Sequence, residues 1–302
     1  MRLAGAVDIG GTGTKLAIVG EDGRIVTRET IPTGDGGEPA SLIERIGATL
    51  GSMLDAARAE GTGTLVSSIG VAVAGFLDTD RSAMFGNANL PELSDYPLRL
   101  ALVARLRRDC RLEVDSNAAL IAEHRHGVGH GAMRTLGVTL GTGLGGSVVV
   151  NGKLLRYTGE CAGDLGHIIV DPNGRQCTCG ARGCLEAMVC SAALSERGGG
   201  RRVRDILAAA RAGEKQALDA LGETGKWLGI GLAGLVPIFA PELIVIGGGI
   251  AAAGELLLEP TRASFHRHAA LGASENLTIV GSQFDGWAGV IGVASLVLNP
   301  EH

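Results

Sequence analysis

The chain has 302 residues, of which 45% are hydrophobic, so it can form one large domain or two domains of ordinary size with a substantial core. The net charge of −5 argues against nucleic acid as a main partner, because a surface that binds phosphate backbones is normally basic. No apolar run approaches the length that spans a bilayer, and the first residues do not resemble a secretory signal. We therefore expect a cytoplasmic location and no membrane partner.

The chain begins with three predicted strands joined by tight turns. An apolar run ends at Asp8, a Gly/Thr turn follows, and an Asp-Gly pair at residues 22–23 separates the second strand from the third. The first turn offers backbone N–H groups, hydroxyls and a cation for a phosphate, and a carboxylate that could hold hydrated Mg²⁺. These residues are Asp8, Gly10, Gly11, Thr12, Gly13, Thr14 and Lys15. A plain Gly-rich hairpin turn would give the same pattern, and the Walker sequence is absent.

A long helix and a buried strand follow. Residues 39–59 begin with a proline and carry apolar side chains at helical spacing, and residues 68–74 form an apolar run typical of a strand. The polar loop after them contains Gly75, Asn87 and Asn89, and it could face a hydroxylated ligand.

An amphipathic helix is predicted near residues 98–108, and a short strand is predicted at residues 111–114. Asp115 comes next, at the point where this strand meets the start of another helix. The local sequence therefore favours a helix N-cap for Asp115.

The second half of the chain repeats the pattern of the first. Residues 135–155 again predict strand, Gly/Thr turn, strand, turn and strand, and the segment LGTGLGGSVVV parallels IGGTGTKLAIV. The turn contains Gly141, Thr142 and Gly143, and it leads into a strand, which excludes a dinucleotide-binding fold. Two such hairpins predict duplicated domains that hold the phosphates of a nucleotide from both sides.

The last third is predicted to be mainly helical. Residues 201–239 have helical spacing, and a buried strand then leads to three glycines and a helix that we expect to open at about Ala251. A helix N-terminus behind a glycine turn lets a ligand approach the backbone. The final helix, within residues 287–302, is expected to return to the first domain.

Four potential metal ligands lie close together between residues 163 and 186. His167, Cys177, Cys179 and Cys184 form a C-x-C-x4-C pattern behind a histidine, with a Pro-Asn-Gly turn between them. Three thiolates and an imidazole suit tetrahedral zinc, and four protein ligands leave no open position, so the site should be structural. Disulfides and buried inert thiols are the alternatives. Disulfides need an oxidising compartment, and the loop is too polar to bury three cysteines as hydrophobic residues.

The run CTCGARGCLE, from Cys177 to Glu186, with Gly166 and His167 before it, resembles the signature of the ROK family of bacterial sugar kinases and sugar-responsive repressors. The resemblance extends over essentially the whole chain and places it in the actin, hexokinase and Hsp70-like superfamily. It implies an α/β fold with two duplicated actin-like (ribonuclease-H-like) ATPase domains that flank a central cleft, and a small zinc-binding loop.

The resemblance also implies a division of the chain. We expect residues 1–113, with the C-terminal helix 287–302, to form the first domain, and residues 114–286 to form the second domain with the zinc motif. ROK proteins are commonly dimers, so a homodimer or a dimer of dimers is expected. The implied ligands are ATP and a sugar, and the implied cofactors are Mg²⁺ with ATP and a structural Zn²⁺.

The implied activity is transfer of the γ-phosphate of ATP to a hydroxyl of glucose or a glucose-like acceptor. The family motif E-N-D-x-N corresponds to residues 113–117 and places the catalytic aspartate at Asp115, which favours a general base over an N-cap at this position. The resemblance places Gly247, Gly248 and Gly249 against the adenosine of ATP. It implies sugar contacts, together with the polar loop, from Gly75, Asn87, Asn89, Val114, Asp115, Asp164, His167 and Glu186.

The sequence departs from the family pattern at two positions. ROK hexokinases usually have Asn where this chain has Val114, and Glu where it has Asp164. The acceptor could therefore be another hexose, an N-acyl amino sugar or a cyclitol. A sugar-responsive repressor is a further alternative, but Asp8 leaves little room for a preceding DNA-binding module. An acetate kinase or a chaperone-type ATPase is a third, and the zinc motif argues against it.

Overall fold

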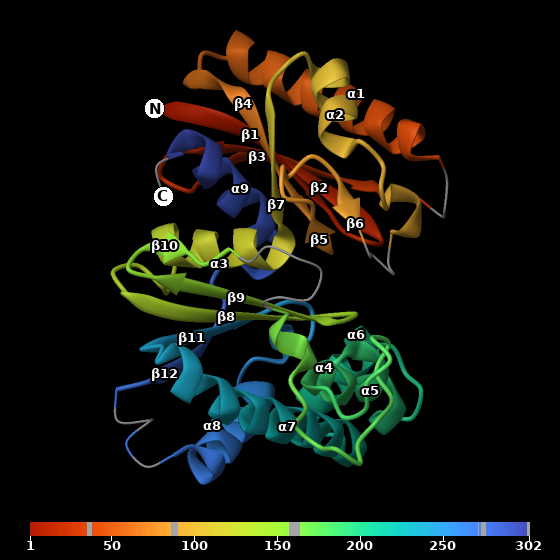
Figure 1. The fold of residues 1–302 in the computed structure, drawn as a ribbon. Coiled ribbons are helices and arrows are strands. Elements are labelled where there is room, and N and C mark those ends of the chain that lie inside the picture. Colours follow the sequence, from red (N-terminus) through yellow and green to blue (C-terminus); the bar gives the residue numbers. More distant parts are fainter. Residues whose placement is uncertain (35–37, 86–89, 157–163, 271, 273–275, 301–302) are drawn as a thin grey trace. The chain divides into compact units, whose positions relative to one another are not determined.

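The computed structural model describes residues 1–34, 38–85, 90–156, 164–270, 272 and 276–300, and it contains two compact units (Figure 1). The first unit comprises residues 1–130, 156–162 and 287–302, and the second comprises residues 131–155 and 163–286. The C-terminal helix thus lies in the first unit. No helix of the described residues is both long and apolar enough to cross a membrane.

The first unit is built on a five-stranded sheet with the order β3-β2-β1-β4-β7. The first three strands along the chain pair antiparallel, whereas β1, β4 and β7 run parallel to one another. The carboxyl ends of these three parallel strands therefore lie at one edge of the sheet. The strands are β1 (Arg2–Ile9), β2 (Gly13–Gly20), β3 (Ile25–Pro32), β4 (Thr64–Val73) and β7 (Cys110–Val114).

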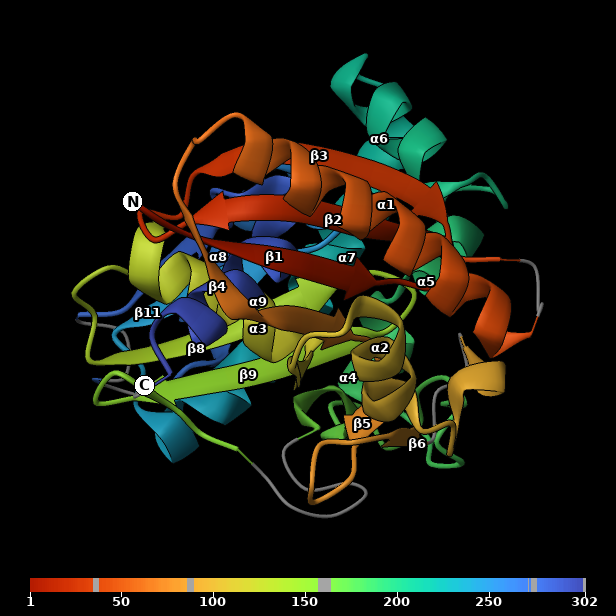
Figure 2. The ribbon, with the colours of Figure 1, turned by 90° about the horizontal axis from the view of Figure 1, so that it is seen from above.

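Helices cover both faces of this sheet. Apolar side chains of α1 and α2 share one core with alternate residues of β1 and β2, and α1 lies over the strands when the unit is seen from above (Figure 2). The opposite face packs against α9, which in turn packs against α3. The helices are α1 (Pro39–Ala59), α2 (Leu98–Leu106), α3 (Asp115–His126) and α9 (Ala288–Leu298). The smaller elements are β5 (Phe76–Leu77), β6 (Met84–Phe85) and η1 (Pro91–Leu93).

The close contact between α3 and α9 explains where the first unit ends. A Cβ at Gly292 of α9 would overlap the carbonyl group of Ala118 in α3, so the glycine allows the two backbones to touch. Helix α3 is consequently part of the first unit, which extends to His130. This division differs from the boundary expected between residues 113 and 114.

The second unit has a sheet with the order β10-β9-β8-β11-β12. Its pairings match those of the first sheet strand for strand, with an antiparallel meander beside two further parallel strands. The α/β class is thus confirmed, while duplication of the halves and a central cleft stay predictions. The strands are β8 (Arg134–Leu140), β9 (Leu144–Val150), β10 (Lys153–Leu154), β11 (Leu243–Gly247) and β12 (Thr278–Gly281).

The helices of the second unit pack around α7 and α8, which share a core with β8 and β11. The helix expected to open at about Ala251 starts later, because residues 251–253 form a short 3-10 turn and Gly254 has a φ of 60°. The helices are α4 (Leu185–Val189), α5 (Ser191–Arg197), α6 (Val203–Arg211), α7 (Lys215–Phe239) and α8 (Glu255–His268). The 3-10 turns are η2 (Leu165–His167), η3 (Ala251–Ala253) and η4 (Asp285–Trp287).

Candidate active site and metal cluster

Three predicted site residues lie where the three parallel strands of the first unit end. Asp8 is the penultimate residue of β1, Gly75 follows β4 by two residues, and Asp115 directly follows β7. In the sheet register Asp8 pairs with Ala72, and Ala72 pairs with Glu113. Ligands of α/β folds commonly bind beyond the carboxyl ends of such strands.

Asp115 does not act as the predicted N-cap. It is the first residue of α3, Val114 occupies the cap position, and Asp115 Oδ1 accepts a hydrogen bond of 2.7 Å from the adjacent Ser116 N–H. Desolvation raises the pKa of Asp115 to about 7, and the negative charge of Asp8 acts in the same direction. The Ser116 N–H and the charge of Lys15 oppose this rise. A carboxyl group that titrates near neutrality is well suited to accept a proton from a substrate.

The first hairpin brings a carboxylate and an ammonium group together. Asp8 and Lys15 are paired across β1 and β2, and Lys15 Nζ lies 3.9 Å from Asp8 Oδ2. Desolvation raises the pKa of Asp8, and the positive charge of Lys15 opposes that effect. The turn itself is held by a hydrogen bond from Gly10 N to Gly13 O, at 3.2 Å.

The predicted phosphate-loop residues do not all face solvent. Gly11 and Thr12 are exposed at the tip of the hairpin, whereas Thr14 is fully buried. The hydroxyls of Thr14 and Thr33 are hydrogen-bonded at 3.0 Å, and Thr33 Oγ1 also donates to Gly10 O at 2.6 Å. Thr14 therefore stabilises the turn and is not itself accessible to a ligand.

Two residues near the end of the chain complete the surroundings of Asp8. A Cβ at Gly289 would lie 2.6 Å from Asp8 Oδ2, so a glycine is needed at the start of α9. The ring of Trp287 lies 4.8 Å from Arg28 Cζ and 6.0 Å from Lys15 Nζ, measured from its centroid. These contacts leave no signal in the local sequence, because the partners are far apart along the chain.

A buried carboxylate next to Asp115 also escaped the sequence analysis. Glu113 is fully buried, and its carboxylate accepts hydrogen bonds from Asn117 Nδ2 at 3.0 Å and from Arg156 Nε at 3.1 Å. It also pairs with Arg81 and accepts from the Val114 N–H at 3.1 Å. These contacts fix the end of β7, which Asp115, the candidate base, follows directly.

The two glycine turns of the second unit lie side by side. The first turn follows β8, the second follows β11, and these strands are parallel neighbours with Gly247 paired to Thr139. Gly248 has a φ of 90°, and a Cβ there would overlap the backbone of Leu140. A Cβ at Gly141 or Gly249 would meet no neighbouring atom within 4 Å, so space is open beside both turns.

The N-terminus of the helix after the second turn lies farther from the glycines than we expected, and it is not suited to an anionic group. The α-helix starts at Glu255, and this acidic residue occupies its first turn. A carboxylate at the positive end of a helix repels a second anion. The glycine backbone therefore remains the feature of this segment that suits a nucleotide.

One predicted ATP-binding residue directly contacts a predicted sugar-binding residue. Glu186 Oε2 accepts a hydrogen bond of 2.8 Å from the Leu144 N–H, and a Cβ at Gly143 would overlap this carboxylate. Ser191 Oγ donates to Gly141 O at 2.7 Å, and Thr142 between these glycines is exposed. The turn after β8 is thus shaped by Glu186 and by the start of α5.

All four predicted metal ligands come together in the second unit. The ligand atoms of His167, Cys177, Cys179 and Cys184 lie within 4.8 Å of one another. The sulfur atoms of Cys179 and Cys184 are 3.6 Å apart, and Cys177 Sγ is 3.6 Å from His167 Nδ1. Ligand atoms of tetrahedral zinc, with bonds of about 2.3 Å to sulfur and 2.0–2.1 Å to nitrogen, are separated by roughly 3.5–3.8 Å. The cluster therefore has the chemistry and the dimensions of a zinc site.

The backbone around the cluster turns back on itself. Gly183 has a φ of 75°, and a Cβ there would overlap the carbonyl oxygen of Asp171, so only glycine fits. A hydrogen bond of 2.8 Å from Cys177 N to Ala181 O closes the loop between the cysteines. Cys184 is the last residue before α4, so this helix continues directly from a ligand.

Asp164 supports the histidine of the cluster. Its Oδ2 lies 3.3 Å from His167 Nε2, and its Oδ1 accepts from the Gly166 N–H at 3.3 Å. Because His167 Nδ1 faces Cys177, the ring can donate its Nε2 proton to Asp164, an arrangement common around metal-binding histidines. The predicted sugar contacts Asn87 and Asn89 lie outside the described residues.

The chain is similar to known proteins over almost its whole length. The ROK family model matches residues 4–299. The glucokinase of Streptomyces coelicolor is 31% identical over 324 residues, which cover 100% of this chain and 99% of that protein. The N-acetylmannosamine kinase of Yersinia pestis is 30% identical over 251 residues, covering 81% of this chain and 82% of that protein.

A solved structure extends the comparison to the fold. The ROK family glucokinase from Streptomyces griseus, in complex with glucose and AMPPNP, has a TM-score of 0.82 and 30% sequence identity. The match covers 97% of this chain and 98% of that protein. The chain belongs to the ROK family.

Proposed function

We propose that this ROK sugar kinase transfers the γ-phosphate of ATP to a hydroxyl of glucose or a glucose-like acceptor, with Asp115 as the general base. The observation that carries the proposal is the raised pKa of Asp115, at the edge where β1, β4 and β7 end. Its carboxylate accepts the hydroxyl proton, the hydroxyl oxygen bonds to the γ-phosphorus, and the bond between that phosphorus and the ADP oxygen breaks. The glucokinase relatives support glucose as the acceptor.

The phosphate groups of ATP are assigned to the glycine-rich turns. Asp8 is suited to hold hydrated Mg²⁺, which when bound neutralises charge on the β- and γ-phosphates. Lys15, 3.9 Å from Asp8, supplies a second positive charge at the same place. In the second unit, the open backbone at Gly141 and Gly249 allows a nucleotide to approach closely.

The metal cluster is assigned to structural zinc. Four protein ligands leave no open coordination position, so the ion when bound contributes folding free energy and no catalytic water. Its effect on the reaction is to position neighbours. Glu186 lies two residues after Cys184, and His167 is itself a ligand, so zinc fixes two of the residues assigned to the sugar.

A different acceptor is the second candidate function. Val114 cannot form a hydrogen bond through its side chain, and both oxygens of Asp164 already have partners within the second unit. An acceptor that lacks, inverts or masks one hydroxyl of glucose would be affected less by these differences. The N-acetylmannosamine kinase relative supports an amino sugar within this group, which also includes other hexoses and cyclitols.

Replacing Asp115 tests the proposal. Asp115→Asn keeps the shape of the side chain but removes the proton acceptor, so kcat should fall by about 10²–10⁴-fold in a coupled ADP-release assay. The assay should screen hexoses, amino sugars and cyclitols with ATP and Mg²⁺. Asp219→Asn, in an exposed Asp–Lys pair of α7, is the matched control and should keep its activity. An Asp115→Asn enzyme with kcat close to wild type would contradict the assignment.

A further inference from the structure

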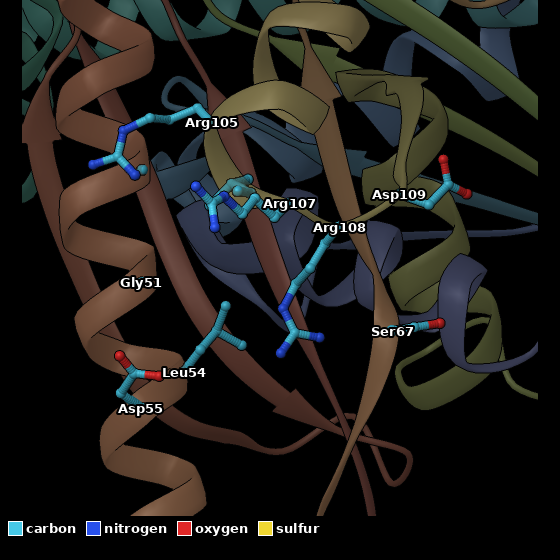
Figure 3. Close-up of a pocket in the computed structure, with 10 residues that line it drawn as sticks. Gly51, Leu54, Asp55, Ser67, Arg105, Arg107, Arg108 and Asp109 are labelled. Atoms are coloured by element: carbon cyan, nitrogen blue, oxygen red, sulfur yellow. The ribbon is translucent and has the colours of Figure 1, made fainter.

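The first unit contains a cavity of about 500 Å³ away from the candidate active site (Figure 3). Helix α1, strand β4, the end of α2 and the segment that joins α2 to β7 line it. Asp109 precedes β7 and Asp115 follows it, so the cavity and the candidate base are roughly 20 Å apart along that strand. The lining residues are Gly47, Gly51, Leu54, Asp55, Ser67, Arg105, Leu106, Arg107, Arg108 and Asp109.

The acidic residues that line the cavity form exposed ion pairs with arginines outside it. Asp55 lies 3.6 Å from Arg58, and Asp109 lies 3.9 Å from Arg99. Neither Arg58 nor Arg99 lines the cavity, so both carboxylates are compensated from outside it. Neither Asp55 nor Asp109 forms an ion pair with an arginine that lines the cavity.

Two of the three lining arginines have no acidic partner. Arg105 Nε lies 2.7 Å from Glu44 Oε2, but no carboxylate of the described residues forms an ion pair with Arg107 or Arg108. Arg108 Nη1 donates to Val66 O at 3.2 Å, which orients the side chain and leaves its other N–H groups available. Figure 3 shows the guanidinium groups of Arg107 and Arg108 between α1 and β4. Arginine forks bind phosphate oxygens with paired hydrogen bonds.

Glycines of α1 make room beside these arginines. A Cβ at Gly47 would overlap the side chain of Arg105, so the glycine allows Arg105 to lie across the helix toward Glu44. A Cβ at Gly51, one turn later, would meet no neighbouring atom within 4 Å. The volume falls in the range of about 300–1,000 Å³ that small-molecule sites occupy.

We propose that this cavity binds a small phosphorylated sugar, with Arg107 and Arg108 holding its phosphate and the sugar filling the space beside Gly51. Asp55, on the α1 side of the cavity, can accept hydrogen bonds from hydroxyl groups. No aromatic side chain is among its lining residues, so it offers no surface on which a nucleotide base would stack. The ligand would contact β4 and the start of β7, two of the strands that carry the candidate active site.

Two variants test the site by different means. Arg107→Gln removes one exposed charge, and Gly51→Leu fills the cavity while placing a better helix former inside α1, so both proteins should fold. Arg267→Gln, at an exposed arginine of α8 without an acidic partner among the described residues, is the matched control. Isothermal titration should use glucose 6-phosphate, inorganic phosphate and AMP as probes at low salt, with melting curves to verify folding. Wild type and variants share the same catalytic site. Any binding of a probe there therefore cancels when each variant is compared with wild type, whichever acceptor the enzyme uses.

Beyond any binding in the catalytic site that all the proteins share, wild type should show a saturable binding event for glucose 6-phosphate. This event should be lost in Gly51→Leu, at least tenfold weaker in Arg107→Gln and unchanged in Arg267→Gln. The binding of inorganic phosphate should be weakened by Arg107→Gln but much less by Gly51→Leu, because this small ion does not reach the space beside α1. Equal binding of glucose 6-phosphate by wild type and both variants would overturn the proposal. If AMP binds wild type more tightly than glucose 6-phosphate does, and if this binding is lost in both variants, the assignment of the cavity to a phosphorylated sugar is overturned.

Discussion

Replacing Asp115 by asparagine should stabilise the protein at neutral and alkaline pH, although it removes the proposed base. Desolvation and the nearby charge of Asp8 raise the pKa of Asp115 from 3.8 to about 7. Between these values the folded protein binds a proton that the unfolded chain has released, so the free energy of unfolding falls as pH rises. The full difference corresponds to about 4 kcal/mol, and partial exposure of the side chain reduces the expected gain to about 1–3 kcal/mol at pH 8.

Urea unfolding of wild type and Asp115→Asn, at about pH 5 and about pH 8, measures this effect. The stabilisation should be larger at pH 8 by about 1–2 kcal/mol, because the wild-type carboxyl group is still protonated in the folded state at pH 5. Asp78 provides a control, because its pKa is shifted in the opposite direction. Desolvation opposes the shift, but hydrogen bonds from Ser82 and Ala83 outweigh it and hold the pKa of Asp78 below its ordinary value.

The Asp78 carboxylate contributes stability that is present above its unfolded pKa and is lost at lower pH, so Asp78→Asn should destabilise the protein by about 1 kcal/mol. That loss should appear at both pH values, since both lie above the pKa of an unfolded aspartate. Lower stability of Asp115→Asn at pH 8, or an equal change at both pH values, would refute our account of Asp115. If Asp115 acted mainly as a helix cap, Asp115→Asn would change the folding stability by the same amount at both pH values.

Two further predictions concern the metal and the acceptor. Cys179→Ser should reduce the zinc content below about one equivalent per chain and lower Tm, because metal-binding free energy is partly folding free energy. Metal analysis of a variant in which serine replaces both Cys177 and Cys179 provides the stricter test. A full equivalent of zinc in that variant would exclude these residues as ligands. Combining Val114→Asn with Asp164→Glu should raise kcat/KM for glucose if these positions select another acceptor. Efficient use of glucose by wild type, with no gain in the double variant, would show that both departures are neutral.

The sequence predicted best what short segments determine alone. The Gly/Thr hairpins, the helix that begins at Pro39 and the ligands between His167 and Cys184 all lie within continuous stretches whose residue types restrict the backbone. In the metal cluster, the spacing of the ligands and the glycine at position 183 together require the chain to fold back. Such features depend little on the rest of the molecule.

The features that the sequence analysis did not anticipate lie where distant segments meet. The start of the helix near Ala251 moved to Glu255 because the glycines shape a turn against Leu140, which lies in another strand. The glycine at position 289 leaves room for the Asp8 carboxylate, although the two residues lie near opposite ends of the chain. The first unit extends to His130 because α3 packs on the last helix. None of these contacts leaves a periodic or compositional signal near the residues concerned.

Glu113 connects the energetics of the fold with the proposed reaction. A buried carboxylate without partners would be costly, and removing one partner from a buried ion pair typically destabilises a protein by about 3–5 kcal/mol. Glu113 avoids that cost because Arg81, Arg156 and Asn117 bond its two oxygens from separate parts of the first unit. The same contacts fix the last residues of β7, and Asp115 follows two positions later. By holding the backbone at the end of β7, the contacts of Glu113 help to keep Asp115 where desolvation disfavours its charge.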